Sequence, residues 1–220
     1  MTDLKLYNYF RSSPSYRVRI ALHLKGLEFK YVPIHLLNNG GEQNSAEYQK
    51  INPAKEVPSL EHEGAIISQS VAIIEYLDEA FPTPALYPKE PHKRARVRQL
   101  AEIINCTHPL QNLKVLQYLE GNLTVSPEQK NKWLNEWMHR GFQAYEEIIR
   151  HTAGRFSVGD QVTAADLFLI PQIFSAQRFS VDISRYKLIS KIEQVCLQMD
   201  VFQKAHPFRQ PDTPNDLRLN

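Results

Sequence analysis

Apolar and polar residues follow two different periods along this chain, and the change falls close to residue 82. Upstream of it, short runs rich in aromatic and β-branched residues are separated by longer stretches with helical spacing. The expected strands are residues 4–9, 29–34, 59–62 and 65–67, with one helix reaching residue 25 and another starting at Ser70. Elements in this order are typical of a small mixed α/β domain with a β-α-β half and a β-β-α half.

The first helix has clear start and stop residues. Ser12 and Ser13 are candidate N-caps, Pro14 suits the first helical turn, and Gly26 follows the last turn. Apolar residues recur inside it at helical spacing and form a wide stripe, interrupted by two arginines. The stripe predicts a helix that lies against the sheet.

The proline-rich segment FPTPALYPKEP, residues 81–91, holds four of the 14 prolines and is interpreted as a linker. Beyond it the strand pattern stops and the spacing is helical, with Pro109 expected to kink or break one helix. Thr163 and Asp166 form a capping-box pattern before another apolar helix. The predicted organisation is therefore an α/β domain (residues 1–82), a linker (83–89) and an all-helical domain (90–220).

Composition narrows the class of protein. The 220 residues are 42% hydrophobic and 23% charged with a net charge of +2, which is typical of a globular domain and gives no reason to expect a nucleic-acid partner. The two cysteines, Cys106 and Cys196, have neither disulfide-scaffold nor metal-ligand spacing. No stretch approaches about 18 apolar residues, and charges interrupt the N-terminal segment, so we expect a soluble cytoplasmic protein without a membrane segment.

Three short segments outline a binding site, although the chain has no GxSxG, HExxH or phosphate-loop motif. Residues 11–15 place cationic and hydroxyl groups at a helix N-terminus, which attracts anions. Pro58 stands at a strand entrance, where a cis turn would leave the backbone of Val57 free for a ligand. Ser70 is expected to cap a second helix whose N-terminus can bind a carboxylate. Each segment alone is explained by helix capping or a loop proline; together they indicate a site for an extended, peptide-like anion.

Two further features are given no function. The basic run at residues 93–98 is interpreted as a solvated or subunit-facing side of a helix. Cys106 lies two positions before His108, and residues at that spacing diverge on a helix, so Cys106 is interpreted as a packed small thiol rather than a nucleophile.

The chain resembles the zeta class of glutathione transferases, which contains the maleylacetoacetate and maleylpyruvate isomerases. The resemblance covers nearly the whole chain and is carried by YFRSSPSYRVRIAL (9–22), NPAKEVPSL (52–60), SQSVAIIEYL (68–77), HPLQNLKVL (108–116), VGDQVTAADLFLIPQI (158–173), RFSVD (178–182) and HPFRQPDTP (206–214). It implies the glutathione transferase fold, an α/β plus all-α architecture with a thioredoxin-like N-terminal domain and an all-helical C-terminal domain. It also implies a homodimer.

The resemblance further implies which residues hold glutathione. Ser12 corresponds to the serine that stabilises the thiolate, with Ser13 beside it. The remaining glutathione positions correspond to Pro14, Gln43, the backbone of Val57, Gln69, Ser70, His108 and Gln111. Arg11 and Arg178 resemble the arginines that hold the carboxylates of the substrate, and no metal is implied.

Pro14 and Tyr16 depart from the family's usual Ser-Ser-Cys-x-Trp-Arg motif, in which cysteine and tryptophan take these two places. A glutaredoxin-like thiol-disulfide activity needs a cysteine at this junction, and its absence argues against that activity. The nucleophile is therefore expected to be the thiol of glutathione.

The expected activity is glutathione-dependent cis–trans isomerisation of a maleyl diketo acid, such as maleylacetoacetate in aromatic amino-acid catabolism, to its fumaryl isomer. Glutathione is then a cofactor that is not consumed. Two alternatives stay open. A general glutathione transferase acting on small electrophiles such as haloacids would use the same thiolate, and a non-catalytic glutathione-binding protein would keep the fold while Pro14 marks a lost active site.

Overall fold

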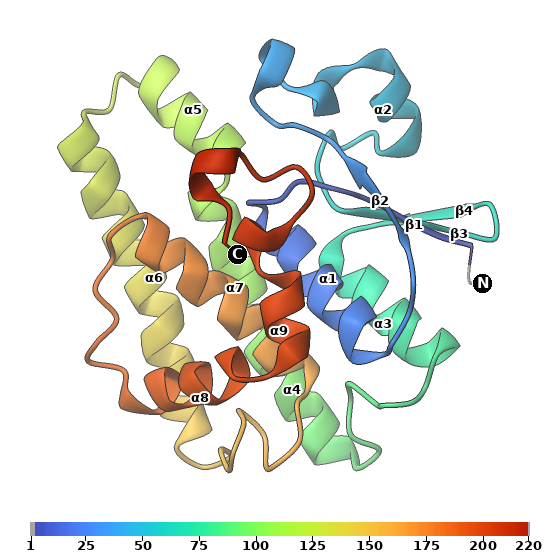
Figure 1. Ribbon diagram of the computed structural model, residues 1–220. Helices are drawn as coiled ribbons and strands as arrows, with labels where there is room; N and C mark the ends of the chain where they lie inside the picture. Colours follow the sequence, from blue (N-terminus) through green and yellow to red (C-terminus); the bar gives the residue numbers. More distant parts are fainter. Residues whose placement is uncertain (1–2, 220) are drawn as a thin grey trace. The chain divides into compact units, whose positions relative to one another are not determined.

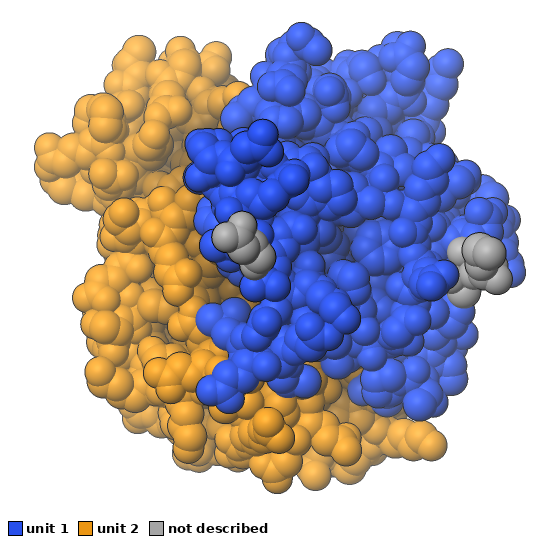
Figure 2. All heavy atoms as spheres, in the orientation of Figure 1, with its two compact units in different colours: residues 1–85, 197–220 blue, residues 86–196 orange. Residues whose placement is uncertain are grey.

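The computed structural model describes residues 3–219, which form two compact units (Figure 2). Unit 1 consists of residues 3–85 together with 197–219, and unit 2 of residues 86–196. The sequence assigned the last segment to the helical domain, whereas it packs with the N-terminal one. The reason is that two buried side chains of the first helix form hydrogen bonds with the backbone of this last segment. Tyr16 Oη donates to the carbonyl of Phe202 (3.3 Å), and Arg19 Nε donates to the carbonyl of Ala205 (3.1 Å).

Unit 1 is built on a four-stranded sheet in the order β2-β1-β3-β4. The strands are β1 (Leu4–Asn8), β2 (Lys30–Pro33), β3 (Ser59–His62) and β4 (Ala65–Ser68), each within one residue of its predicted bounds. β1 runs parallel to β2 and antiparallel to β3, and a tight hairpin joins β3 to β4. Glu63 and Gly64 in that hairpin both have positive φ (50° and 79°), which suits the twist of a two-residue turn.

The helices of unit 1 are α1 (Ser13–Leu24), α2 (Ala46–Ile51), α3 (Ser70–Ala80) and α9 (Asp200–Ala205). Short 3₁₀ turns lie at Asn38–Gly40, Glu42–Asn44, Pro207–Arg209 and Asn215–Leu217. Figure 1 shows α1 and α3 on one side of the sheet and α2 on the other, and α9 packs against α1. The expectation that Ser70 caps α3 is wrong, because Ser70 is the first helical residue and Gln69 holds the cap position.

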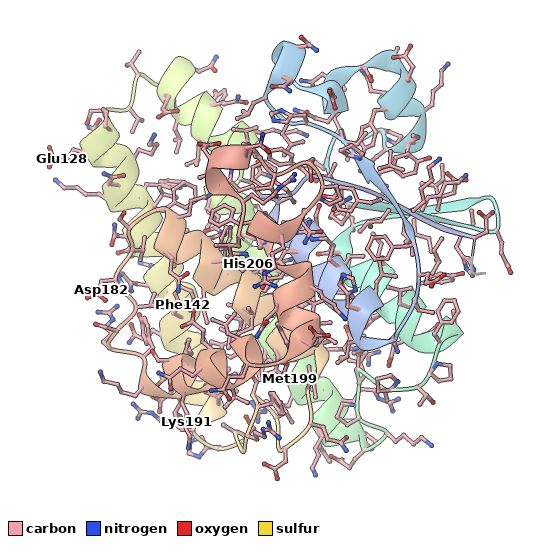
Figure 3. The ribbon with its side chains drawn as sticks, in the orientation of Figure 1. Glu128, Phe142, Asp182, Lys191, Met199 and His206 are labelled. Carbon is pink, nitrogen blue, oxygen red and sulfur yellow. The ribbon has the colours of Figure 1, made fainter. Side chains whose placement is uncertain are left out.

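Unit 2 contains only helices in its regular structure. They are α4 (Pro91–Thr107), the 3₁₀ turn His108–Gln111, α5 (Leu113–Gly121), α6 (Pro127–Ile149), α7 (Ala164–Arg178) and α8 (Lys187–Leu197), whose last residue lies at the boundary with unit 1. α4 packs against both α6 and α7, and Phe142 of α6, labelled in Figure 3, is fully buried. The predicted break at Pro109 is confirmed, since the chain leaves α4 at Thr107.

The apolar helix α7 starts with the predicted capping box. The Asp166 carboxylate accepts from the backbone N–H of Thr163 (2.8 Å), and its other oxygen accepts from the N–H of Ser157 (2.9 Å). Asp166 is fully buried, and this burial raises its pKa. In residues 3–219, no helix has the length and apolar character needed to cross a membrane.

Candidate functional site

The start of α1 presents a serine hydroxyl. Ser12 has extended backbone angles and its Oγ accepts from the N–H of Ser15 (3.3 Å), so the predicted N-cap is confirmed. The N–H of Ser12 in turn donates to the carbonyl of Tyr9 (3.1 Å), which closes the turn between β1 and α1. The Ser12 oxygen is used as an acceptor, so its hydrogen is left for an anion at the positive end of the helix. Ser13 and Pro14 follow as the first two helical residues, Ser13 being buried.

The turn before β3 has the predicted cis bond between Val57 and Pro58. Val57 is buried, and residues 3–219 provide no hydrogen bond to its backbone N–H or carbonyl. The turn is held from the α2 side, where Tyr48 Oη and Asn52 Nδ2 both donate to the carbonyl of Glu56 at 2.8 Å. Burial raises the pKa of Tyr48 to about 12, so its hydroxyl stays protonated as that donor. The backbone of Val57 is therefore positioned and available.

The start of α3 lacks a side-chain cap. Gln69 occupies the cap position with φ of 73° and makes no capping hydrogen bond. The hydroxyl of Ser70 accepts from Arg17 Nη1 (3.1 Å), a fully buried side chain of α1, so the two helix starts are joined through Arg17. Because no side chain of residues 3–219 accepts from the first N–H groups of α3, these donors at a positive helix end are available to an anion.

Gln43 adds a buried acceptor. Its Nε2 donates to the carbonyl of Leu36 (3.4 Å), while its Oε1 is buried and has no hydrogen-bond partner within the described chain. Gly41, whose φ is 95°, lies directly against the side-chain amide of Gln43, and a Cβ at position 41 would overlap that side chain. A buried acceptor without a partner costs free energy unless a ligand donor reaches it.

Arg11 lies in the same turn as Ser12. Its side chain is half-buried, with the guanidinium 5.9 Å from the centre of the Phe10 ring. Its Nε is buried and lacks a hydrogen-bond partner among residues 3–219. A cation held in this way can accept a bidentate carboxylate without first breaking an ion pair.

One buried apolar cluster packs against both the β1–α1 turn and the cis-proline turn. Its buried members are Tyr9 and Phe10 from the β1–α1 turn, Tyr48 from α2, and Val57 from the cis-proline turn. The structure thus brings the turns carrying Ser12 and Val57 onto a shared core. Sequence reasoning did not find Tyr48 and Asn52, because the acceptor that they share is a backbone carbonyl, which residue type does not reveal. It did not find Arg17, because the partner Ser70 is 53 positions away.

The remaining predicted site residues belong to unit 2. His108 starts the 3₁₀ turn, and its Nδ1 lies 3.1 Å from Gln111 Nε2. Gln111 also forms a reciprocal, buried amide pair with Gln172, at 2.6 and 3.2 Å. The Gln111 side chain is fixed by Gln172 and in turn orients the ring of His108. A direct contact of Gln111 with glutathione stays a prediction. Arg178 is exposed at the end of α7, with its guanidinium 4.2 Å from the centre of the Phe179 ring.

The interpretation of Cys106 as a packed thiol is wrong, since Cys106 is exposed. Its sulfur donates to Glu102 Oε1 (3.5 Å), and partial desolvation of the sulfur together with this neighbouring carboxylate raises the pKa of the thiol. A raised pKa disfavours the reactive thiolate, so Cys106 gains no nucleophilic role by being exposed. No cluster of metal-ligating side chains occurs in the part of the chain that the structure describes.

The sheet order, the cis-proline turn and the two helix starts of unit 1 define a thioredoxin-like, glutathione-transferase type of domain. In agreement, residues 6–85 match the family model described as the N-terminal domain of glutathione S-transferase.

Comparisons over the full length are more specific. The maleylacetoacetate isomerase of Mus musculus is 49% identical over 97% of this chain and 96% of its own length. The holo structure of a bacterial maleylpyruvate isomerase of the zeta class is 41% identical, with a TM-score of 0.92 over 96% of this chain and 100% of the other. The maleylacetoacetate isomerase of Anaeromyxobacter dehalogenans 2CP-1, solved with glutathione in its active site, is 43% identical, with a TM-score of 0.86 over 97% and 99% of the two chains. This chain belongs to the zeta-class glutathione transferase family of maleylacetoacetate and maleylpyruvate isomerases.

Proposed function

We propose that this protein is a glutathione-dependent cis–trans isomerase that converts maleylacetoacetate, or a related maleyl diketo acid, to the fumaryl isomer. The observation that carries the proposal is the start of α1, where Ser12 presents a hydroxyl hydrogen at a positive helix end and the chain places no thiol of its own. The site is equipped to stabilise a thiolate that a bound molecule brings.

Glutathione fits the groups that unit 1 leaves without partners. The N–H groups at the start of α3, with Gln69 and Ser70, suit the γ-glutamyl carboxylate. The backbone of Val57 can pair with the cysteinyl peptide group in the manner of an added strand. The unpartnered Oε1 of Gln43 offers an acceptor to a ligand N–H. The family resemblance adds His108 and Gln111 to the residues that bind glutathione.

The hydrogen bond from Ser12 and the helix N-terminus together are strong enough to lower the pKa of the glutathione thiol. A free thiol has a pKa of about 8.5, and lowering it by two units requires about 2.7 kcal/mol. A hydroxyl hydrogen bond to a charged group contributes about 1.5–3 kcal/mol, and a helix N-terminus about 0.3–1 kcal/mol. The two contributions together are sufficient without a cysteine at position 14.

Bound glutathione supplies a thiolate that adds reversibly to the conjugated cis double bond and so permits rotation. Arg11 and Arg178 would hold the two carboxylates of the substrate, because the planar guanidinium pairs with a carboxylate through two parallel hydrogen bonds. Their positive charge also stabilises negative charge that develops on the substrate.

The decisive experiment incubates the protein with glutathione and either maleylacetoacetate or maleylpyruvate, and follows isomer formation and free thiol together. The expected result is rapid formation of the fumaryl isomer with no loss of thiol. Consumption of thiol with small haloacids and no isomerisation would support the general transferase instead. Glutathione binding without any turnover would support the non-catalytic alternative.

We also propose that the protein is a cytoplasmic homodimer, as the family resemblance implies. Sedimentation equilibrium measures the oligomeric state, and a monomer at micromolar concentration would contradict the dimer.

A further inference from the structure

The segment from His206 to Leu219, here called the tail, is a tightly bonded part of unit 1. It follows α9 at His206, which is labelled in Figure 3. Gln210 is buried and its Nε2 donates to the carbonyls of Lys204 and His206, both at 2.8 Å. The hydroxyl of Thr213 donates to the carbonyl of Pro207 (2.7 Å). The tail therefore has one defined conformation between its two ends.

That conformation directs Asp212 toward the β1–α1 turn. One oxygen of its carboxylate accepts from the backbone N–H of Phe10 (3.0 Å), and the other accepts from the hydroxyl of Tyr31 on β2. Phe10 and Asp212 are 202 positions apart in the sequence. Hydrogen bonds to an ionised carboxylate are stronger than those between neutral groups, so this contact restrains the Phe10 peptide firmly.

The other side of Phe10 is held by Arg19, whose side chain is fully buried. Its Nη2 donates to the carbonyl of Phe10 (2.9 Å) and its Nη1 to the carbonyl of Tyr9 (3.3 Å). Its Nε donates to Ala205, directly before the tail. Both peptide groups of Phe10 are thus fixed by buried or half-buried charges, and Phe10 is two residues before Ser12.

We propose that Asp212 is a positioning residue for Ser12, acting through the Phe10 amide, and that the tail is part of the support of the thiolate site. Ser12 must place its hydroxyl within hydrogen-bond distance of a sulfur, and a displacement of the turn by about 1 Å weakens such a bond severely. The apolar contact of Phe208 with the Tyr9 and Phe10 cluster would keep the tail close without fixing the peptide orientation. The effect on the thiol rests on the proposed function, whereas the restraint on Phe10 does not.

The test begins with the glutathione-free protein. Amide hydrogen exchange measured by NMR should show Phe10 strongly protected in the wild type, and Asp212→Ala should exchange at Phe10 faster by about tenfold or more, the loss expected for one charge-assisted bond. Asp212→Asn keeps a neutral acceptor for the N–H of Phe10, so its exchange rate at Phe10 should fall between those of the wild type and Asp212→Ala. Tyr31→Phe removes only the second partner of Asp212 and should have the smaller effect.

Glu146→Ala is the control for lost stability. The Glu146 carboxylate also accepts two backbone N–H groups, from Leu188 and Ile189 (both 3.0 Å), but it lies in unit 2. It should destabilise the protein without changing the local opening of Phe10. With glutathione added, Asp212→Ala should raise the pKa of the bound thiol and the KM for glutathione, and Asp212→Asn should restore both in part.

Two results would overturn the proposal. One is a wild-type Phe10 amide that exchanges as fast as the amide of Gly40 in an exposed turn. This measurement uses the wild-type protein alone, so it does not depend on whether a variant folds. The other is an Asp212→Ala protein that loses stability but keeps wild-type exchange at Phe10. A wild type that neither binds glutathione nor isomerises substrate would refute the proposed function, and the exchange of Phe10 would still decide the role of Asp212.

Discussion

The helices α7 and α3 begin in opposite ways. At the start of α7 the buried Asp166 accepts from the N–H groups of Thr163 and Ser157, and the N–H of Ala164 donates to the carbonyl of Leu86 (2.9 Å). At the start of α3 the cap residue Gln69 has a left-handed conformation, and the described residues provide no side-chain cap bond.

The difference shows how a helix start is used. Every helix leaves N–H donors without partners in its first turn, and these must be satisfied by the protein, by water or by a ligand. Unit 2 supplies acceptors for the N–H groups of Thr163 and Ala164 at the start of α7, which stabilises the buried helix start. Unit 1 leaves those of α3 open and tolerates an unfavourable backbone conformation at Gln69, as expected where a ligand completes the site.

The largest effect is expected where the donors are satisfied internally. Asp166→Ala would leave two buried N–H groups without acceptors and lower the free energy of unfolding by about 3 kcal/mol or more. Urea denaturation measures the loss. The control is Asp160→Ala, because Asp160 accepts from the N–H of Arg155 (2.9 Å) but is exposed, so it should lose less than about 1 kcal/mol. Equal losses would show that burial of the cap is irrelevant.

Ser12→Ala should separate capping from chemistry at the start of α1. Losing the cap on Ser15 lowers the free energy of unfolding by about 1 kcal/mol, and losing the hydroxyl raises the pKa of bound glutathione by about one unit or more. Turnover should fall at neutral pH and fall less at high pH, where the thiol ionises unaided. A spectroscopic titration of the bound thiol measures the shift.

Ser126→Ala is the matched control for that variant. Ser126 caps α6 in the same way, accepting from the N–H of Gln129 (3.2 Å), but it lies in unit 2 on an exposed turn. It should lose comparable stability and leave the thiol pKa unchanged. An unchanged thiol pKa in Ser12→Ala as well would remove Ser12 from the mechanism.

Gln69→Gly tests whether the strained start of α3 serves a ligand. Glycine adopts positive φ freely, so this substitution should leave stability unchanged or raise it by up to about 1 kcal/mol, while glutathione affinity falls by about tenfold. Glu63→Gly, at the β3–β4 turn with φ of 50°, should give the same stability gain with no change in affinity. Scanning calorimetry measures the stability of each variant, and titration calorimetry with glutathione measures its affinity. If the affinity of Gln69→Gly were unchanged, as expected for Glu63→Gly, a binding role for Gln69 would be contradicted.

The parts of the fold that the sequence predicted are those specified by neighbouring residues. The strands of unit 1 and the start of α1 follow from alternation and from Ser12 with Pro14, and the start of α7 follows from Thr163 with Asp166. In each case the partner group lies within a few positions, where spacing and residue type identify it.

The parts that it missed depend on contacts between distant segments. α2 has six residues, too few to show a helical period. The segment from residue 197 onward looks like the end of a helical domain until two bonds are seen: Arg19 of α1 donates to Ala205, and Asp212 of the tail accepts from Phe10 in the β1–α1 turn. Gln69, not Ser70, became the cap of α3 because a left-handed backbone, which is not readable from residue type here, sets the helix start. The site was therefore predicted as a set of residues, but not the supports that hold it.

The smallest effect concerns Pro14, which follows Ser13 as the second residue of α1. Proline removes one N–H donor from the helix start and places an unreactive ring where the family's usual motif has a thiol, while its fixed φ favours the first turn. Pro14→Cys should make the protein vulnerable, because a cysteine at a helix N-terminus ionises readily and is alkylated by an electrophilic substrate. Activity and intact mass, followed over many turnovers in both proteins, test this: only Pro14→Cys should lose activity and gain mass. An inactive wild type that Pro14→Cys makes active would mean that the thiol is essential, and the non-catalytic alternative would then hold for this chain.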